Sequence, residues 1–173
     1  MALEIAIRRF GGPEVLEARD LPPEPPAKGQ IRIRQKAIGV NFTDVHGRRG
    51  DYAPLHALPM PLVLGIEAVG VVDAVGEGVR SFRAGDRVGY ASGPIGAYRE
   101  VRNFPAERCV ALPSGVSDQA AAALLLKGLT LQTLLRRVFR VPAGAGVVFH
   151  SAAGGVGSLA GQWLRAIGAR AIG

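Results

Sequence analysis

A glycine-rich segment at residues 145–157, AGVVFHSAAGGVG, has the spacing of a dinucleotide-binding turn. Gly154 lacks the Cβ that would block backbone approach to a pyrophosphate, and Gly157 would let the following helix lie close to the preceding strand. The N–H groups and positive dipole end of that helix would face the phosphates. Ala152 replaces the first glycine of the usual G-x-G-x-x-G motif, so the pattern alone fits a packed glycine-rich turn equally well. The candidate cofactor-binding residues here are Ala153, Gly154, Gly155, Val156 and Gly157.

The flanking sequence supplies the strand and the helix that a dinucleotide site requires. Residues 147–149 are consecutive and bulky, which is typical of a strand buried on both faces. Apolar residues then recur at helical spacing over 158–167, and 169–172 predict a second strand. A dinucleotide fold needs further strands and a residue that reads the ribose. We therefore expect an incomplete α/β domain, either truncated or completed by something else.

Length and composition indicate one domain and part of another. The chain has 173 residues, 48% of them hydrophobic, and a formal net charge of +7. The basic residues are scattered, which favours a solvated surface that attracts an anionic cofactor over a nucleic-acid interface. Cys109 is the only cysteine, so we expect a buried structural thiol in a reducing compartment. Without a signal-peptide core or a membrane-length apolar stretch, the expected location is cytoplasmic, with no membrane partner.

Strand signals dominate the first part of the chain. Alternating or valine-rich apolar residues predict strands at 3–7, 31–34, 65–75 and 87–90. In the first, positions 3, 5 and 7 would form the apolar face, opposite Glu4, and the following glycine-proline turn predicts a hairpin. Ser117 can cap a helix over 120–126, and 129–138 predicts a second helix. The fold class is therefore mixed, a β-rich domain followed by the start of an α/β domain.

Five motifs in order along the chain resemble those of one enzyme family. They are GGPEVL at 11–16, AIGVNFTD at 37–44, GDRV at 85–88, LKGLT at 126–130 and AAGGVG at 152–157. Together they are similar to the NADPH-dependent quinone oxidoreductases, the zeta-crystallin-like, zinc-independent branch of the medium-chain dehydrogenase/reductase superfamily. The resemblance implies a GroES-like catalytic domain at 1–122, an incomplete Rossmann NADP-binding domain at 123–173, and an active-site cleft between them.

The resemblance also bears on metal binding. Zinc-dependent members of the superfamily carry cysteine and histidine where this chain has Asn41 and Ile66. Zinc needs thiolate, imidazole or carboxylate ligands, so the aliphatic Ile66 cannot coordinate it. The chain lacks the cysteines of a structural zinc site, and its three histidines are scattered. We expect no metal.

The resemblance then implies direct hydride transfer to a positioned acceptor, with Asn41, Asp44 and Tyr52 as candidate catalytic residues. Asn41 can donate to an acceptor oxygen or a cofactor hydroxyl, or can simply end a strand. Asp44 can relay a proton or orient its loop, and can equally cap the helix after Asn41. Tyr52 matches the family's pocket tyrosine, which can bond or stack on a quinone, or else anchors a surface loop. Thr130 resembles the threonine beside the nicotinamide, although a helical threonine can bond its own backbone.

Three more positions bear on this site. Relatives commonly carry an aromatic residue where this chain has His46, which changes the polarity expected for the acceptor site. Lys127 can meet the cofactor or lie in solvent. Glu67 stands among apolar neighbours and is a candidate for a buried, paired carboxylate.

These inferences predict NADPH-dependent reduction of quinones or similar conjugated carbonyls, by a protein that is a homodimer at full length. One alternative is an enoyl or alkene reductase of the same superfamily, which needs a proton donor after hydride reaches carbon. Another is a non-enzymatic GroES-like binding module. The family alone implies NADPH rather than NADH, because the discriminating residue would lie beyond Gly173. We expect the 173-residue chain by itself to be inactive.

Overall fold

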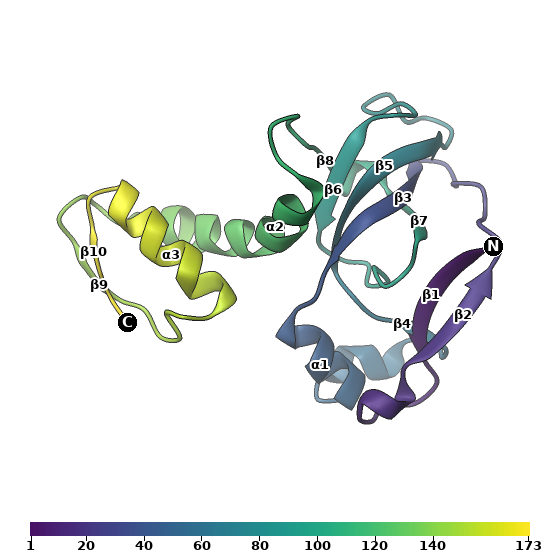
Figure 1. The fold of residues 1–173 in the computed structure, drawn as a ribbon, viewed down its shortest axis with the longest axis horizontal. Coiled ribbons are helices and arrows are strands. Elements are labelled where there is room, and N and C mark those ends of the chain that lie inside the picture. Colours follow the sequence, from purple (N-terminus) through teal and green to yellow (C-terminus); the bar gives the residue numbers. More distant parts are fainter. The chain divides into compact units, whose positions relative to one another are not determined.

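The computed structural model describes residues 1–173 and contains two compact units, Met1–Ala123 and Leu124–Gly173. Helix α2 (Asp118–Gln132) spans the boundary in sequence and is drawn in green in Figure 1. None of the helices combines the length and apolar character needed to cross a bilayer.

The first unit contains two antiparallel sheets (Figure 1). One has three strands in the order β2-β1-β4, and the other has five in the order β7-β3-β5-β6-β8. The strands are β1 (Ala2–Ile7), β2 (Glu17–Leu21), β3 (Gln30–Gly39), β4 (Leu62–Val63), β5 (Glu67–Val75), β6 (Arg87–Ala91), β7 (Val101–Pro105) and β8 (Val110–Ala111). The helical segments are η1 (Pro13–Val15), α1 (Phe42–Arg49), η2 (Ala53–Ala57) and η3 (Ala106–Arg108).

The core of the five-stranded sheet follows the predicted alternation. Ile31 and Ile33 on β3 are fully buried, whereas the arginines between and after them reach solvent or an ion pair. They pack with Tyr90 and Phe104, whose rings stack with centroids 4.1 Å apart. The guanidinium of Arg102 lies over both rings, 4.9 and 4.5 Å from their centroids. Strand periodicity therefore identified this part of the core.

Strand β1 forms the predicted hairpin with β2, but only Ile7 of the predicted apolar face is fully buried, and the opposite face is buried as well. Glu4 is buried, while Leu3 is 39% exposed. The Glu4 carboxylate lies 3.4 Å from Nη1 of Arg19 and 3.2 Å from Nη2 of Arg99. Two cations from other segments thus compensate its burial, which no local apolar pattern reveals.

Helix α2 replaces the two helices predicted near this point. Its start is as predicted, because Oγ of Ser117 accepts the Ala120 N–H at 3.2 Å. It then continues through Gly128 to Gln132 and passes into the π-helical segment η4 (Thr133–Val138). Glycine inside a helix costs only about 1 kcal/mol, and the apolar residues around Gly128 favour the helix strongly enough to offset that cost.

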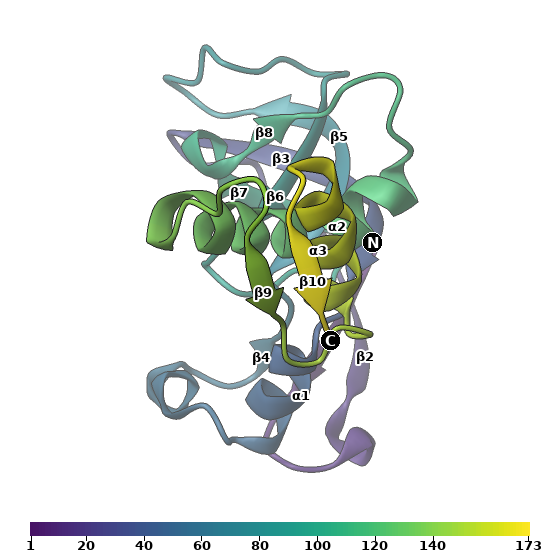
Figure 2. The same cartoon turned by 90° about the vertical axis from the view of Figure 1, so that its left-hand side faces the viewer.

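The second unit contains the predicted strand-helix-strand. Strands β9 (Gly146–Val148) and β10 (Arg170–Ile172) are parallel and lie side by side in Figure 2, and α3 (Gly155–Ala166) connects them. Ala160 and Leu164 of α3 are fully buried, as their helical spacing predicted.

The prediction that β9 is buried on both faces was wrong. Val147 packs into the core of this unit, but Val148 is 68% exposed and Ile172 is 59% exposed. A two-stranded sheet with its helix on one face leaves the other face open to solvent.

Candidate active site

The loop from β3 into α1 carries Asn41 and Asp44. Asn41 is the N-cap residue, in extended conformation, and its backbone N–H donates to Oδ2 of Asp44 at 2.8 Å. The Asp44 N–H in turn donates to the Asn41 carbonyl at 2.9 Å. Asp44 thus satisfies an N–H at the helix start and places a negative charge there, where the helix dipole favours one. The capping interaction considered for Asp44 is therefore present.

The Asn41 side chain is bound by Glu67, the first residue of β5. Nδ2 of Asn41 donates to Oε1 of Glu67 at 2.8 Å, and Glu67 is fully buried. Gly39 lies directly opposite Glu67 in the β3–β5 ladder, and a Cβ there would overlap the carboxylate side chain. The glycine thus makes room for a buried carboxylate that orients the Asn41 amide. Glu67 is the buried, paired group that its apolar neighbours suggested.

Tyr98 completes this arrangement, and sequence reasoning missed it. Its hydroxyl donates to Oδ2 of Asp44 at 2.8 Å, and Asp44 is buried. Burial raises the pKa of Tyr98 well above its usual range, and the hydrogen bond to Asp44 and the charge of that carboxylate raise it further. Gly65, at φ +90°, admits the tyrosine ring, because a Cβ there would lie 2.7 Å from Cδ1 of Tyr98.

Asn41, Asp44, Glu67 and Tyr98 form one polar cluster, which we call the Asn41 network. Three separate segments of the first unit contribute to it. No local pattern marks Tyr98, since its partner Asp44 is 54 positions away.

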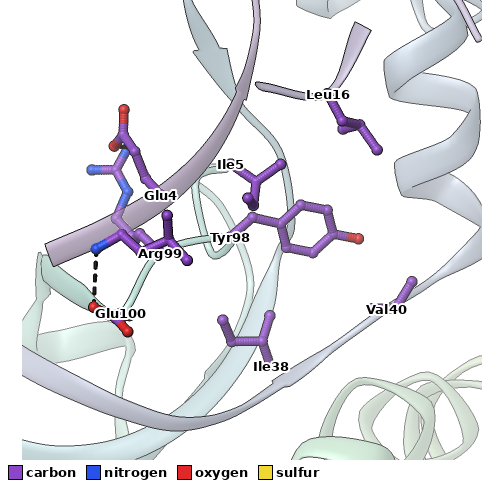
Figure 3. A pocket seen from close by; sticks show the side chains of 9 residues that line it. Glu4, Ile5, Leu16, Ile38, Val40, Tyr98, Arg99 and Glu100 are labelled. Atoms are coloured by element: carbon purple, nitrogen blue, oxygen red, sulfur yellow. Dashed lines mark hydrogen bonds and ion pairs between the residues drawn. The ribbon is translucent and has the colours of Figure 1, made fainter. Parts of the chain in front are cut away.

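An apolar pocket lies beside the Tyr98 ring (Figure 3). Its volume is about 360 Å³, and Figure 3 shows Ile5, Leu16, Ile38 and Val40 around the ring. Val40 directly precedes Asn41 in the chain and is 72% exposed. The pocket suits an apolar group rather than a charged one.

Tyr52, the third predicted catalytic residue, lies outside the Asn41 network. It is 54% exposed and precedes η2. Oδ2 of the preceding residue, Asp51, lies 3.0 Å from Nδ1 of His46 and 3.5 Å from Nε of Arg49. The structure therefore places Tyr52 at the end of a loop that is joined to the last turn of α1.

The glycine turn belongs to the second unit. Ser151 has a positive φ of 58°, and its carbonyl accepts the Gly154 N–H at 2.8 Å. A Cβ at Gly157 would lie 2.6 Å from Cα of Ala152, so the backbone of the turn itself excludes a side chain there. This contact differs from the expected one, which was close approach of the helix to the strand.

The residues of this turn fit a pyrophosphate. Gly154 is the N-cap of α3 and provides no side-chain cap, and the N–H groups of the first turn have no intrahelical acceptor. A Cβ at Gly155 would lie 3.0 Å from Cε of Lys127, so this lysine reaches the start of α3. N–H donors, the helix dipole and a cation thus converge where the phosphates would bind. The predicted cofactor residues at this end are Ala153, Gly154, Gly155, Val156 and Gly157.

Thr130 uses its hydroxyl within α2. Oγ1 donates to the carbonyl of Leu126 at 2.9 Å, which is the backbone interaction considered for it from the sequence. Thr130 is an exposed residue, and its hydroxyl oxygen keeps the capacity to accept a hydrogen bond.

The structure also locates the positions that bear on zinc. Nowhere in the chain do three or more His, Cys, Asp or Glu side chains gather closely enough to hold a metal ion. Ile66 is half-buried and directly precedes Glu67. The groups of the Asn41 network that could offer an atom to a metal are the Asn41 amide, the carboxylates of Asp44 and Glu67, and the Tyr98 phenol.

Comparison with known proteins places these features in context. Residues 27–114 match the alcohol dehydrogenase GroES-like domain, in agreement with the predicted fold class. The chain is 47% identical over all 173 residues to a quinone oxidoreductase of Pseudomonas aeruginosa, of which it covers 52%. A crystal structure of Escherichia coli quinone oxidoreductase complexed with NADPH superposes with a TM-score of 0.94 at 45% identity, over 99% of this chain and 52% of that one. A 2-haloacrylate reductase of Burkholderia is 40% identical over all of this chain and 53% of its own length. The chain thus spans about half the length of the curated relatives it matches.

Proposed function

The chain belongs to the alcohol dehydrogenase GroES-like domain family, and from this premise we propose that it forms part of an NADPH-dependent quinone reductase. The observation that carries the proposal is the bond that Nδ2 of Asn41 donates to the buried Glu67 carboxylate, which fixes an amide donor at the start of α1. Similarity over all of this chain, and over 52% of the relative, to a quinone oxidoreductase supports the choice of acceptor.

We propose that residues 123–173 begin a Rossmann domain that holds the cofactor by its pyrophosphate. The parallel strand-helix-strand and the open N–H groups at the start of α3 support this role. Lys127 adds a positive charge at the same point. The similarity to a structure complexed with NADPH supports that cofactor over NADH. When bound, the nicotinamide supplies the hydride.

The residues of this chain would position the acceptor. Asn41 would donate to an acceptor oxygen or a cofactor hydroxyl, with its amide plane fixed by Glu67. Tyr52 would bond or stack on the acceptor ring, and Thr130 would lie beside the nicotinamide. Asp44 would act by holding Asn41 and Tyr98 in place, since its carboxylate bonds both. Such positioning lowers the barrier without a change in the chemistry of the cofactor.

We propose that this chemistry proceeds without zinc. Asn41 and Ile66 stand at the positions of two zinc ligands in metal-dependent relatives, and Ile66 offers no donor atom. The Asn41 amide is instead bonded to the carboxylate of Glu67. Metal analysis after dialysis tests this point: we expect no stoichiometric zinc, and about one retained zinc per chain would contradict it.

The similarity to a 2-haloacrylate reductase favours one alternative, reduction of an activated carbon–carbon double bond. Oxidation of NADPH by the product of the complete gene, measured with a panel of quinones, enones and 2-haloacrylates, separates the two. Quinones as the preferred acceptors support our proposal. Preference for an alkene acceptor supports the alternative, and NADPH binding without turnover of any acceptor supports a non-enzymatic binding module.

We also propose that the complete protein is a cytoplasmic homodimer and that its acceptors include similarly conjugated carbonyls, as the resemblance implies. Sedimentation velocity of the complete product measures the mass directly. A monomer at micromolar concentration would contradict the homodimer.

A further inference from the structure

We propose that His46, oriented by Asp51, donates the proton that accompanies hydride transfer to the acceptor; this inference rests on the proposed function. The motivating feature is a histidine–carboxylate pair on the same short segment as Asn41 and Tyr52. Nδ1 of His46 lies 3.0 Å from Oδ2 of Asp51.

The pair is built by the end of α1. Gly50, at φ +83°, ends the helix in the left-handed conformation, and the Asp51 N–H donates to the His46 carbonyl at 3.0 Å. This turn brings the Asp51 carboxylate back over the helix to the imidazole. Phe42, one helical turn before His46, packs edge-on against the ring at a centroid distance of 5.0 Å. The imidazole is therefore held by a carboxylate on one side and an aromatic edge on the other.

This contact sets the direction of the imidazole. With Nδ1 facing Asp51, the other nitrogen, Nε2, points away from the pair. The His46 side chain is 49% exposed, so its proton can exchange with solvent. The charged groups that face the imidazole are Asp51, whose carboxylate contacts Nδ1, and Arg49, whose Nε lies 3.5 Å from the same carboxylate.

The position along the chain connects the pair to the acceptor site. Asn41 caps α1, Phe42 and His46 lie on its exposed face, and Tyr52 directly follows Asp51. One segment of twelve residues, 41–52, thus carries an amide donor, an imidazole and a phenol. In contrast, Asp44 on the same helix is buried and bonded to Tyr98, which makes it a poor source of exchangeable protons.

Reduction of a quinone to a hydroquinone requires one hydride and one proton. The hydride, with its two electrons, comes from NADPH and reduces the quinone. The Nε2–H bond of the His46 imidazolium breaks, its electron pair stays on nitrogen, and a new O–H bond forms on the quinone oxygen. Solvent then reprotonates the neutral imidazole, and Asp51 stays a carboxylate throughout.

The test combines two readouts. In the 173-residue protein, the ¹⁵N NMR signals of the His46 ring report whether Nδ1 is bonded to Asp51. We expect Asp51→Asn to shift the Nδ1 signal, because the facing carboxylate is lost. Arg49→Gln is the matched control, since it removes the other partner of Asp51 and keeps the carboxylate. An Nδ1 signal that Asp51→Asn leaves unchanged would overturn the pairing.

The second readout is the pH dependence of quinone turnover by the product of the complete gene. We expect the wild-type kcat to fall at alkaline pH and Asp51→Asn to alter this limb of the profile. His46→Phe should lose about a hundredfold in kcat, with the alkaline limb gone. If the wild type reduces quinones, and the wild type, Asp51→Asn and His46→Phe share the same pH profile of kcat, this inference alone is overturned. Absence of quinone turnover in the wild type would instead overturn the proposed function and, with it, this role of His46.

Discussion

Asn41 and Glu67 lie 26 positions apart in the sequence and are joined by a hydrogen bond of 2.8 Å from Nδ2 to Oε1. Glu67 is fully buried, and this bond helps to offset the cost of burying its carboxylate. It also fixes the amide plane at the start of α1, where we place the acceptor. The role proposed for Asn41 therefore depends on a contact that also contributes to stability, and separate substitutions can distinguish the two.

Replacing Glu67 tests the structural side of this contact. Glu67→Ala leaves the Asn41 amide without its acceptor and opens a cavity, so we expect a loss of about 2–3 kcal/mol in the free energy of unfolding. Glu67→Gln keeps a carbonyl oxygen at the same place and should lose less. Urea denaturation followed by circular dichroism measures both, with Glu77→Ala as an exposed control. Equal stability of the alanine and glutamine variants would contradict this account.

The Tyr98–Asp44 bond gives a prediction with a defined pH dependence. Burial, and then the hydrogen bond to Asp44, raise the pKa of Tyr98 in the folded protein. The native state therefore holds the phenol proton more tightly than the unfolded chain. This contribution to the free energy of unfolding is complete below the unfolded pKa, about 10, and is lost as the pH rises toward the folded pKa.

Tyr98→Phe should cost about 1 kcal/mol at pH 7 by removing the hydrogen bond. Above pH 10 the wild type should lose stability more steeply than the variant. Tyr90, whose pKa burial also raises, is present in both proteins, so the difference between their curves isolates Tyr98. Parallel curves from pH 8 to 11 would refute the assignment.

Much of the backbone could be predicted from the sequence because its signals are local. Helical spacing at Ala160 and Leu164 and strand alternation at Ile31 and Ile33 correspond directly to burial in the structure. Each of these residues packs within a regular element whose period sets the face it presents.

The contacts of the candidate site were less accessible, because they depend on partners far along the chain. The burial of Glu4 on β1 was not predicted, because it depends on Arg19 and Arg99, and neither is near in sequence. Tyr98 was missed for the same reason, since only the fold brings it to Asp44. Resemblance to a family identified Asn41, but the bond that orients it needed the structure.

Two glycines of α3 provide a matched pair for testing the glycine turn. At Gly157 a Cβ would collide with the backbone of the turn, so Gly157→Ala should destabilise the second unit by about 1–3 kcal/mol. At Gly161 a Cβ would meet nothing within 4 Å, so Gly161→Ala should stabilise the helix by about 0.5–1 kcal/mol. Thermal unfolding followed by the fluorescence of Trp163, the only tryptophan, reports on both. Similar effects of the two substitutions would argue against the turn geometry.

Cys109 should be an unreactive thiol. Burial raises its pKa to about 12, so little thiolate exists at pH 8. We expect Ellman's reagent to label the native protein at least about a hundredfold more slowly than the protein in urea, where the thiol is accessible and its pKa returns to normal. Since this is the only cysteine, the absorbance reports it alone. Rapid labelling of the native protein would show that the thiol is not protected.

We propose that Asn41 positions the acceptor for reduction by NADPH. The most direct measurement is the rate of NADPH oxidation with 1,4-benzoquinone by the product of the complete gene, compared between the wild type and Asn41→Ala. We expect wild-type turnover with one NADPH consumed per hydroquinone formed. In Asn41→Ala we expect kcat/KM to fall by about tenfold or more, the loss of roughly one hydrogen bond in the transition state. Wild-type turnover that Asn41→Ala leaves unchanged, or a wild type that binds NADPH and reduces no quinone, would contradict the account.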